Sequence, residues 1–290
     1  VLLLSAALGL SAVPAHAFFE NVTVSPRARG MGETGVAALD APFAAYLNPG
    51  LLAGNPHGAA SASYVRPFGL DFTDYFFLGA ALPSTDGRGG FGVGFSSFAV
   101  AYEDVDLLKE TRLSFAYGHT LYEDLHSTID VGASLNWYRV EQGETVTGLE
   151  PDSDSCFGLD MGLVVTLHKR TRLGVLVGNL NNPQIGVDQE ELPRRLIAGL
   201  SYEPYAGVTT TFEINSELAR DAQYHGGVEM TITEGFVLRG GVITNPNKLT
   251  AGFGVYTGPV IVNYGFGTGG GVLDSTHQFG IKTTWGGEAQ

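Results

Sequence analysis

The sequence predicts an all-β fold, a transmembrane antiparallel β-barrel of about 14 strands with an N-terminal plug in its lumen. The first observation is the stretch Phe157–Leu167, in which every odd position carries a large apolar residue. The even positions of the same stretch hold glycine, aspartate, glycine, valine and threonine. Because successive side chains of a strand point to opposite faces, this strand has one apolar face and one small or polar face. Repeated along a chain, this pattern is typical of a barrel with lipid outside and a polar lumen.

The second observation is the spacing of the predicted strands and their connections. Several joins after even-numbered strands are tight, whereas the joins at 141–155 and 180–193 are long. Short turns at one end and longer loops at the other are a property of outer-membrane barrels. Most segments have the ~9–11 residues that a tilted strand needs to cross a membrane. The alternation and turn residues predict strands at 58–67, 74–83, 90–100, 111–119, 128–140, 156–167, 171–179, 194–203, 207–215, 223–233, 235–243, 248–256, 259–267 and 276–285.

The third observation is the composition. Charged residues make up 16% of the 290 residues, against about 25% in ordinary soluble domains. The chain has 41 glycines, roughly twice the usual share, and glycine inside a strand marks a close approach of another backbone or side chain. A soluble β-sandwich would show the same alternation, but the number and length of the strands and the glycine-rich second face favour a membrane barrel.

The chain divides into three predicted parts. Residues 1–17 resemble a secretory signal peptide, with an apolar run followed by Ala15-His16-Ala17 as a cleavage site. Residues 18–56 form the predicted plug segment, and residues 57–286 form the barrel. This organisation predicts export to the bacterial outer membrane, with outer-membrane lipid as the surrounding partner. The net charge of −14 argues against nucleic acid as a partner.

The two faces of the predicted sheet differ in chemistry. The lipid-facing set includes large residues such as Phe115, Leu135 and Phe279, and the inward set is small and polar. Charges of both signs in a lumen can pair across it and brace the wall, because unpaired buried charges are costly. The candidate lumen residues are Arg112, Asp130, Asp160, Glu213, His225, Glu229, Arg239 and Lys282.

The plug segment carries the most distinctive motif of the chain. Asp40 is predicted to cap a short helix, with Pro42 tolerated in its first turn. The run Asn48-Pro49-Gly50 is predicted to end that helix, because proline disfavours a helical residue before it and glycine allows a reversal. The motif residues are Arg27, Arg29, Gly30, Met31, Gly32, Asp40, Asn48, Pro49 and Gly50.

These motifs resemble the PorV/PorQ family of outer-membrane proteins, relatives of the FadL fatty-acid transporter barrels. The resemblance rests on Arg27–Gly32, Asp40–Tyr46 and Asn48–Leu51, and on C-terminal runs such as Leu192–Tyr202 and Asp274–Gly280. It implies a 14-stranded barrel whose N-terminal segment plugs the lumen, and some members of the family shuttle or anchor cargo of the type IX secretion system. Gly50 departs from the alanine usual in the family, and Trp285 is not the terminal residue.

Two functions remain open at this stage. The family resemblance and the acidic predicted external loops favour a non-enzymatic, secretion-associated or scaffold barrel that binds exported proteins or secretion machinery. The alternative is a FadL-like transporter for hydrophobic small molecules, which needs a pocket lined by apolar side chains. A plain diffusion pore is disfavoured by the plug. No hydrolase, zinc-protease or redox motif occurs in the sequence, so no catalytic residue, cofactor or metal is predicted.

Overall fold

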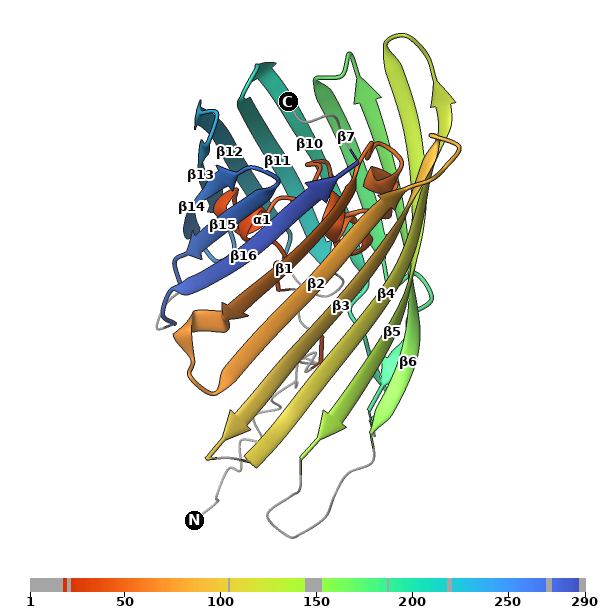
Figure 1. Cartoon of the computed structure of the whole chain (residues 1–290). Helices are drawn as coiled ribbons and strands as arrows, with labels where there is room; N and C mark the ends of the chain where they lie inside the picture. The colour runs from red at the N-terminus through yellow and green to blue at the C-terminus, as the bar shows by residue number, and fades with distance from the viewer. Residues whose placement is uncertain are drawn as a thin grey trace, which may run out of the picture.

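The computed structural model of the chain describes residues 18–19, 22–103, 105–143, 153–186, 188–217, 221–269 and 273–286. Within these ranges, fourteen antiparallel strands close a barrel in which sequence neighbours pair and β16 returns to β1 (Figure 1). The predicted fourteen-stranded antiparallel barrel is therefore confirmed. The predicted signal peptide, residues 1–17, lies outside the described residues. The barrel strands are β1 Gly58–Arg66, β2 Thr73–Pro83, β3 Gly89–Tyr102, β4 Val105–Glu123, β5 Ser127–Gln142, β6 Asp154–Leu167, β7 Thr171–Gly178, β10 Arg195–Tyr205, β11 Val208–Glu217, β12 Gln223–Thr233, β13 Phe236–Ile243, β14 Lys248–Thr257, β15 Val260–Gly267 and β16 Thr276–Trp285.

Two features of the sheet differ from the predicted spans. Strand β4 covers Val105–Glu123, much more than the predicted 111–119. Charged residues near its ends hide the alternation there, although the backbone continues to pair with β3 and β5. The predicted long loop after β7 contains a small hairpin of β8 Gln184–Ile185 and β9 Glu190–Glu191. Strands of two residues are too short to produce a readable alternation.

The outer face of the barrel is apolar. Side chains such as Phe115, Leu196 and Phe279 are about half exposed, with exposed fractions of 54%, 52% and 56%. In β6 the exposed residues include Phe157 and Met161, whereas Asp160 is buried on the inner face, as the alternation predicted. No helix in the described part of the chain is long and apolar enough to cross a membrane.

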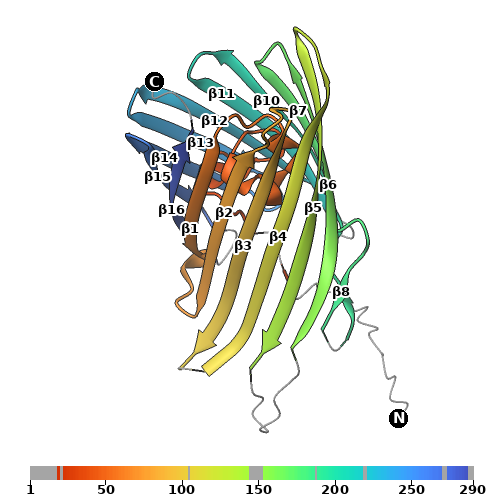
Figure 2. The same cartoon turned by 45° about the vertical axis from the view of Figure 1, so that its right-hand side comes forward.

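The two ends of the barrel carry different connections. At the end where β1 begins and β16 ends, Gly58 lies opposite Trp285. The tight turns β6–β7, β10–β11, β12–β13 and β14–β15 also lie there, and we call it the short-turn end. At the opposite, long-loop end β5 ends and β6 begins, and the β8–β9 hairpin also lies there (Figure 2).

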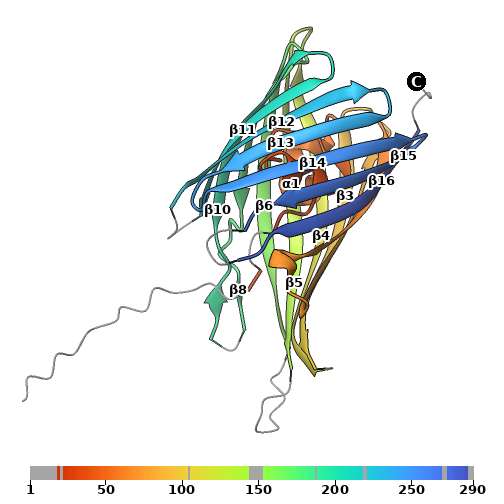
Figure 3. The same cartoon turned by 90° about the vertical axis from the view of Figure 1, so that its left-hand side faces the viewer.

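Residues 22–56, which we call the inner segment, lie inside the barrel (Figure 3). The inner segment contains short helical pieces and contacts the inner faces of strands from both sides of the lumen. Its pieces are α1 Pro26–Gly30, η1 Ala41–Phe43, α2 Ala44–Leu47 and η2 Pro49–Leu52, and a further turn, η3 Pro67–Gly69, follows β1.

Inward-facing glycines let the backbone of the inner segment approach the wall. A Cβ atom placed on Gly241 would meet the backbone of Met31 and Gly32, and one on Gly132 would meet the backbone of Pro49 and Gly50. Such a clash with backbone atoms cannot be relieved by a rotamer change. Much of the unusual glycine content therefore makes room for a second layer of backbone. Other glycines in this position are Gly79, Gly90, Gly118, Gly174, Gly227 and Gly265.

We predict that Gly241→Ala destabilises the protein, whereas Gly240→Ala on the same strand does not. The added methyl group at Gly241 meets the inner segment, but one at Gly240 has no heavy atom within 4 Å. Overpacking of this kind typically costs about 1–3 kcal/mol. Thermal unfolding of the purified variants in detergent measures the difference. Equal unfolding temperatures for the two variants would contradict this packing.

Candidate functional site

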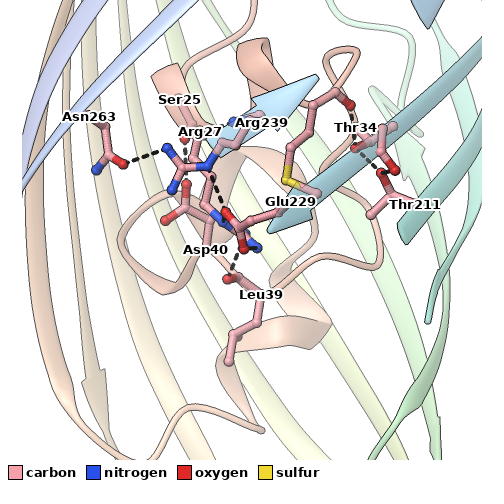
Figure 4. A network of polar contacts seen from close by, with 12 residues as sticks. Ser25, Arg27, Thr34, Leu39, Asp40, Thr211, Glu229, Arg239 and Asn263 are labelled. Carbon is pink, nitrogen blue, oxygen red and sulfur yellow. Dashed lines mark hydrogen bonds and ion pairs between the residues drawn. The ribbon is translucent and has the colours of Figure 1, made fainter. Parts of the chain in front are cut away.

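Three charged groups join the inner segment to β12 and β13. The Arg27 guanidinium donates two hydrogen bonds to the Glu229 carboxylate, each 2.8 Å long. Arg239 donates to the same carboxylate at 2.6 Å and to Asn263 Oδ1 at 2.9 Å (Figure 4). Arg27 also donates to the Leu39 carbonyl oxygen. Two cations thus share one carboxylate, and the pairing fixes α1 against the wall.

A second ion pair fixes the inner segment to β16. The Asp40 carboxylate accepts hydrogen bonds from the Ser25 hydroxyl at 2.5 Å and from Lys282 Nζ at 3.2 Å. Burial alone would raise the pKa of Asp40, but Lys282, Arg27 and the Ser25 bond outweigh burial and hold that pKa below its usual value. The predicted helix-capping role of Asp40 is wrong, because its side chain makes no cap bond to η1. The carboxylate is instead taken up by the longer-range ion pair.

The remaining motif residues of the inner segment also contact the wall. Arg29 donates to Gln278 Oε1 at 2.7 Å and pairs with Glu33 at 2.8 Å. The Gly32 N–H donates to Thr250 Oγ1 at 2.9 Å, and the Gly32 carbonyl oxygen lies 2.7 Å from His225 Nδ1. Gly30 and Met31 are buried in the same region.

The turn at Asn48-Pro49-Gly50 forms as predicted after α2. The Asn48 Oδ1 atom accepts the Gly50 N–H at 3.0 Å, and the Asn48 side-chain amide donates to the Val36 carbonyl oxygen at 2.8 Å. Asn48 is fully buried. This side chain therefore closes its own turn and holds it against a neighbouring loop of the inner segment.

Arg112, Asp160 and Asp130 lie in the wall rather than at the contacts of α1. The Arg112 guanidinium pairs with Asp160 at 3.2 Å and lies 4.9 Å from the centre of the Tyr46 ring. Asp130 accepts hydrogen bonds from Thr120 and Thr128 of neighbouring wall positions. Asp130 and Asp160 thus brace the strands, whereas Arg112 contacts both the wall and the inner segment.

A cavity of about 200 Å³ lies between the inner segment and the long-loop end. Aromatic and aliphatic side chains, among them Tyr75, Phe77 and Tyr138, which are 8%, 1% and 2% exposed, share the lining with polar and charged side chains such as Arg112 and Glu213. The expectation of a uniformly small and polar inner face is therefore wrong for this half of the lumen. Further apolar lining residues are Val22, Val24, Val36, Leu176, Ile197 and Ile243.

The wall of the cavity is incomplete on one side. Strand β7 ends at Gly178, so β6 pairs with it only over Met161–Leu167. The segment after β7 fills the gap: the Asn181 side chain accepts from Leu159 N–H at 2.9 Å and donates to the Phe157 carbonyl oxygen at 2.8 Å. The Asn181 amide thereby makes two hydrogen bonds to β6 of the kind that the backbone of a neighbouring strand would otherwise make.

Asn179 closes the same gap from the inside. Its Oδ1 atom accepts from the Tyr138 hydroxyl at 3.1 Å, and its side-chain amide donates to the Pro193 carbonyl oxygen at 2.9 Å. Asn179, Pro193 and Arg195 also line the cavity. We call residues 179–186 and 188–193 the side segment; it begins where β7 ends and contributes Asn179 and Pro193 to the cavity lining.

Comparisons with solved structures identify the fold. A CymD monoaromatic hydrocarbon channel superimposes with a TM-score of 0.66 at 14% identity, covering 91% of this chain and 98% of that one. The Pseudomonas putida toluene transporter TodX gives 0.61 at 12% identity, covering 91% and 99%. A Pseudomonas aeruginosa FadL homologue gives 0.57 at 12% identity, covering 92% and 99%. No protein-family model matches the sequence, and no curated protein matches it.

At these identities the likeness establishes the fold alone. The 14-stranded barrel implied by the resemblance is therefore confirmed, and its fold is similar to that of a FadL homologue. Membership of the PorV/PorQ family stays a prediction. Among the described residues, no group of three or more histidine, cysteine, aspartate or glutamate side chains could hold a metal ion.

We predict that Asp40→Asn lowers stability near neutral pH and that the difference from the unsubstituted protein narrows on acidification. A carboxylate whose pKa is lowered by folding stabilises the protein above its unfolded pKa of about 3.9 and loses that effect as the pH falls through the folded pKa. Thermal unfolding between pH 7 and pH 3 measures the difference. A gap that stays constant across this range would show that the Asp40 charge is not the source of the effect.

We also predict that Asn181→Ala destabilises the side segment, whereas Asn182→Gly does not, because Asn182 has a φ of 47°, which glycine adopts without strain. Loss of the Asn181 amide leaves one N–H and one carbonyl group of β6 unpaired, at a cost of about 1–3 kcal/mol. Limited proteolysis of the side segment is the measurement, and cleavage should be faster in Asn181→Ala. Unchanged protection would show that this amide does not hold the segment.

Proposed function

We propose that the chain is a passive channel of the bacterial outer membrane for small, largely apolar molecules. The observation that carries this proposal is the cavity of about 200 Å³ with its aromatic lining. A dry engineered cavity of about 150 Å³ binds benzene, so this space is sufficient for a molecule with one ring. The fold supports the same proposal, because the similar structures include a monoaromatic hydrocarbon channel and a toluene transporter.

The outer surface supports a membrane setting. Large apolar side chains are exposed around the barrel, including those of β4, β6, β11 and β16. A soluble protein rarely exposes an apolar surface of this extent, whereas lipid favours it. The signal peptide at 1–17 remains a prediction, and it fits export to this membrane.

We further propose that the inner segment acts as a plug. Its backbone packs against inward glycines in the short-turn half of the lumen, and its ion pairs fix it on several strands. Movement straight along the barrel axis would require these contacts to break. The side segment, which is held by side-chain hydrogen bonds and a hairpin of two-residue strands rather than by the strand pairing of the barrel, offers a shorter path between the cavity and the outer face.

The secretion-associated scaffold has less support than the channel. It was motivated by the PorV/PorQ resemblance and by acidic loops, and much of the main acidic loop, 144–152, lies outside the described residues. The similar structures are channels and transporters. Binding of exported proteins or secretion machinery therefore remains a separate prediction.

Uptake into vesicles with a lipopolysaccharide outer leaflet tests the channel, because this leaflet slows the entry of apolar molecules. We expect the protein to speed the entry of radiolabelled propylbenzene severalfold and to leave glucose entry unchanged. Ile197→Trp should abolish the effect, since Ile197 is buried and lines the cavity. Leu196→Trp on the exposed outer face is the matched control. Equal uptake with and without the protein would reject the proposed channel.

A further inference from the structure

Three buried hydrogen-bonding side chains face the cavity from one part of its wall. Glu213 and Asn215 on β11 and His225 on β12 line the cavity and are only 5%, 8% and 4% exposed. Glu213 lies directly opposite His225 in the strand register, and Asn215 is the next inward position on β11. Because directly opposed side chains have Cβ atoms about 4.5–5.5 Å apart, the three form one cluster. We call it the acceptor cluster.

The contact of His225 with the inner segment determines whether the second ring nitrogen, Nε2, can donate or accept a hydrogen bond. Its Nδ1 atom lies 2.7 Å from the Gly32 carbonyl oxygen, and a carbonyl oxygen can only accept. Nδ1 must therefore carry the proton, so Nε2 of the neutral ring is an acceptor. Nε2 is buried and has no partner among the described residues.

Asn215 and Glu213 add to this unsatisfied acceptor capacity. The Asn215 Oδ1 atom is buried with no hydrogen-bond partner in the described part of the chain. Glu213 accepts the N–H groups of Gly35 and Val36 through Oε2, at 2.9 and 3.0 Å. No ion pair to Glu213 occurs among the described residues. A buried carboxyl group beside two unpartnered acceptors is costly unless a hydrogen-bond donor joins them.

Most of the other charges on the cavity wall have oppositely charged neighbours. Arg112 pairs with Asp160, and Glu33 pairs with Arg29. Arg195 lies opposite Glu217 in the register of β10 and β11. Lys248, the first residue of β14, has its Nζ atom 5.7 Å from the centre of the Phe68 ring. Glu213 is thus an acid of the cavity wall without an ion pair among the described residues, and it lies in the acceptor cluster.

We propose that the acceptor cluster binds the ammonium group of a small organic amine whose apolar body lies in the aromatic part of the cavity. An ammonium group supplies three N–H donors and a positive charge, which matches the Glu213 carboxylate, Asn215 Oδ1 and His225 Nε2. The aromatic rings of Tyr75, Phe77 and Tyr138 provide the opposite surface. This inference rests on the proposed channel and names the class of molecule that the channel selects.

A matched ligand pair tests the proposal. The molecules 2-phenylethylamine and propylbenzene have the same size and differ in an ammonium or a methyl end group. We expect calorimetry on the purified protein at pH 8 to show that the amine binds about tenfold to a hundredfold more tightly. At this pH an alkylamine is protonated and an ordinary histidine is neutral. The anion 3-phenylpropanoate should bind more weakly than both.

Substitutions in the acceptor cluster locate the effect. Asn215→Leu and Glu213→Gln should each weaken amine binding about tenfold and leave propylbenzene binding unchanged. The glutamine retains an oxygen for the Gly35 and Val36 N–H groups, which protects the fold. Ser96→Ala, on the opposite side of the cavity, is the control and should leave the preference intact. Thermal unfolding of each variant confirms that it is folded.

The outcomes separate this inference from the proposed channel. Equal binding of the amine and propylbenzene, or a preference that survives in both cluster variants, would overturn the amine site while leaving the channel in place. Binding of neither molecule to the folded protein would overturn the proposed cavity function and the amine site together.

Discussion

The structure depends on the contact between two layers of backbone in the lumen. The inner segment touches the wall at inward glycines such as Gly132, Gly227 and Gly241, where a single methyl group would collide with main-chain atoms. Because the two backbones lie so close together, Arg27 reaches Glu229 and Asp40 reaches Lys282. The position of the inner segment then sets the size of the cavity, because the segment forms its floor and part of its lining.

The sequence was sufficient to predict where the strands lie, but it did not show for every strand which side chains point into the lumen. Alternation is a local signal, and where one face is apolar and the other small, as in Phe157–Leu167, it gives both the span and the orientation. In β2 both faces are apolar, so nothing local revealed that Tyr75 and Phe77 point inward. Counting in register from the inward glycine at 79 would have placed them in the lumen.

The candidate site was harder to predict because its partners are distant in sequence. Arg27 and Glu229 are separated by 202 positions, and their pairing follows only from the closed barrel and the path of the inner segment. The inward direction of Glu229 and His225 could be read from the strand period, but their partners could not. The short β7 agrees with the predicted span 171–179, but the hydrogen bonds of the Asn181 side chain to β6 could not be predicted, because they follow no periodic pattern.

The seam between β1 and β16 has a consequence for the closure of the barrel. These strands close the barrel, and they also bind the inner segment: Ser63 on β1 donates to the Val24 carbonyl oxygen, and Gln278 on β16 contacts Arg29 and the Thr23 carbonyl oxygen. The first and the last strand of the barrel therefore both bind the inner segment at the place where they pair with each other. The bonds of Ser63 and Gln278 to this segment form only when residues 22–56 lie in the lumen, so the seam gains its full set of hydrogen bonds only with the inner segment in place.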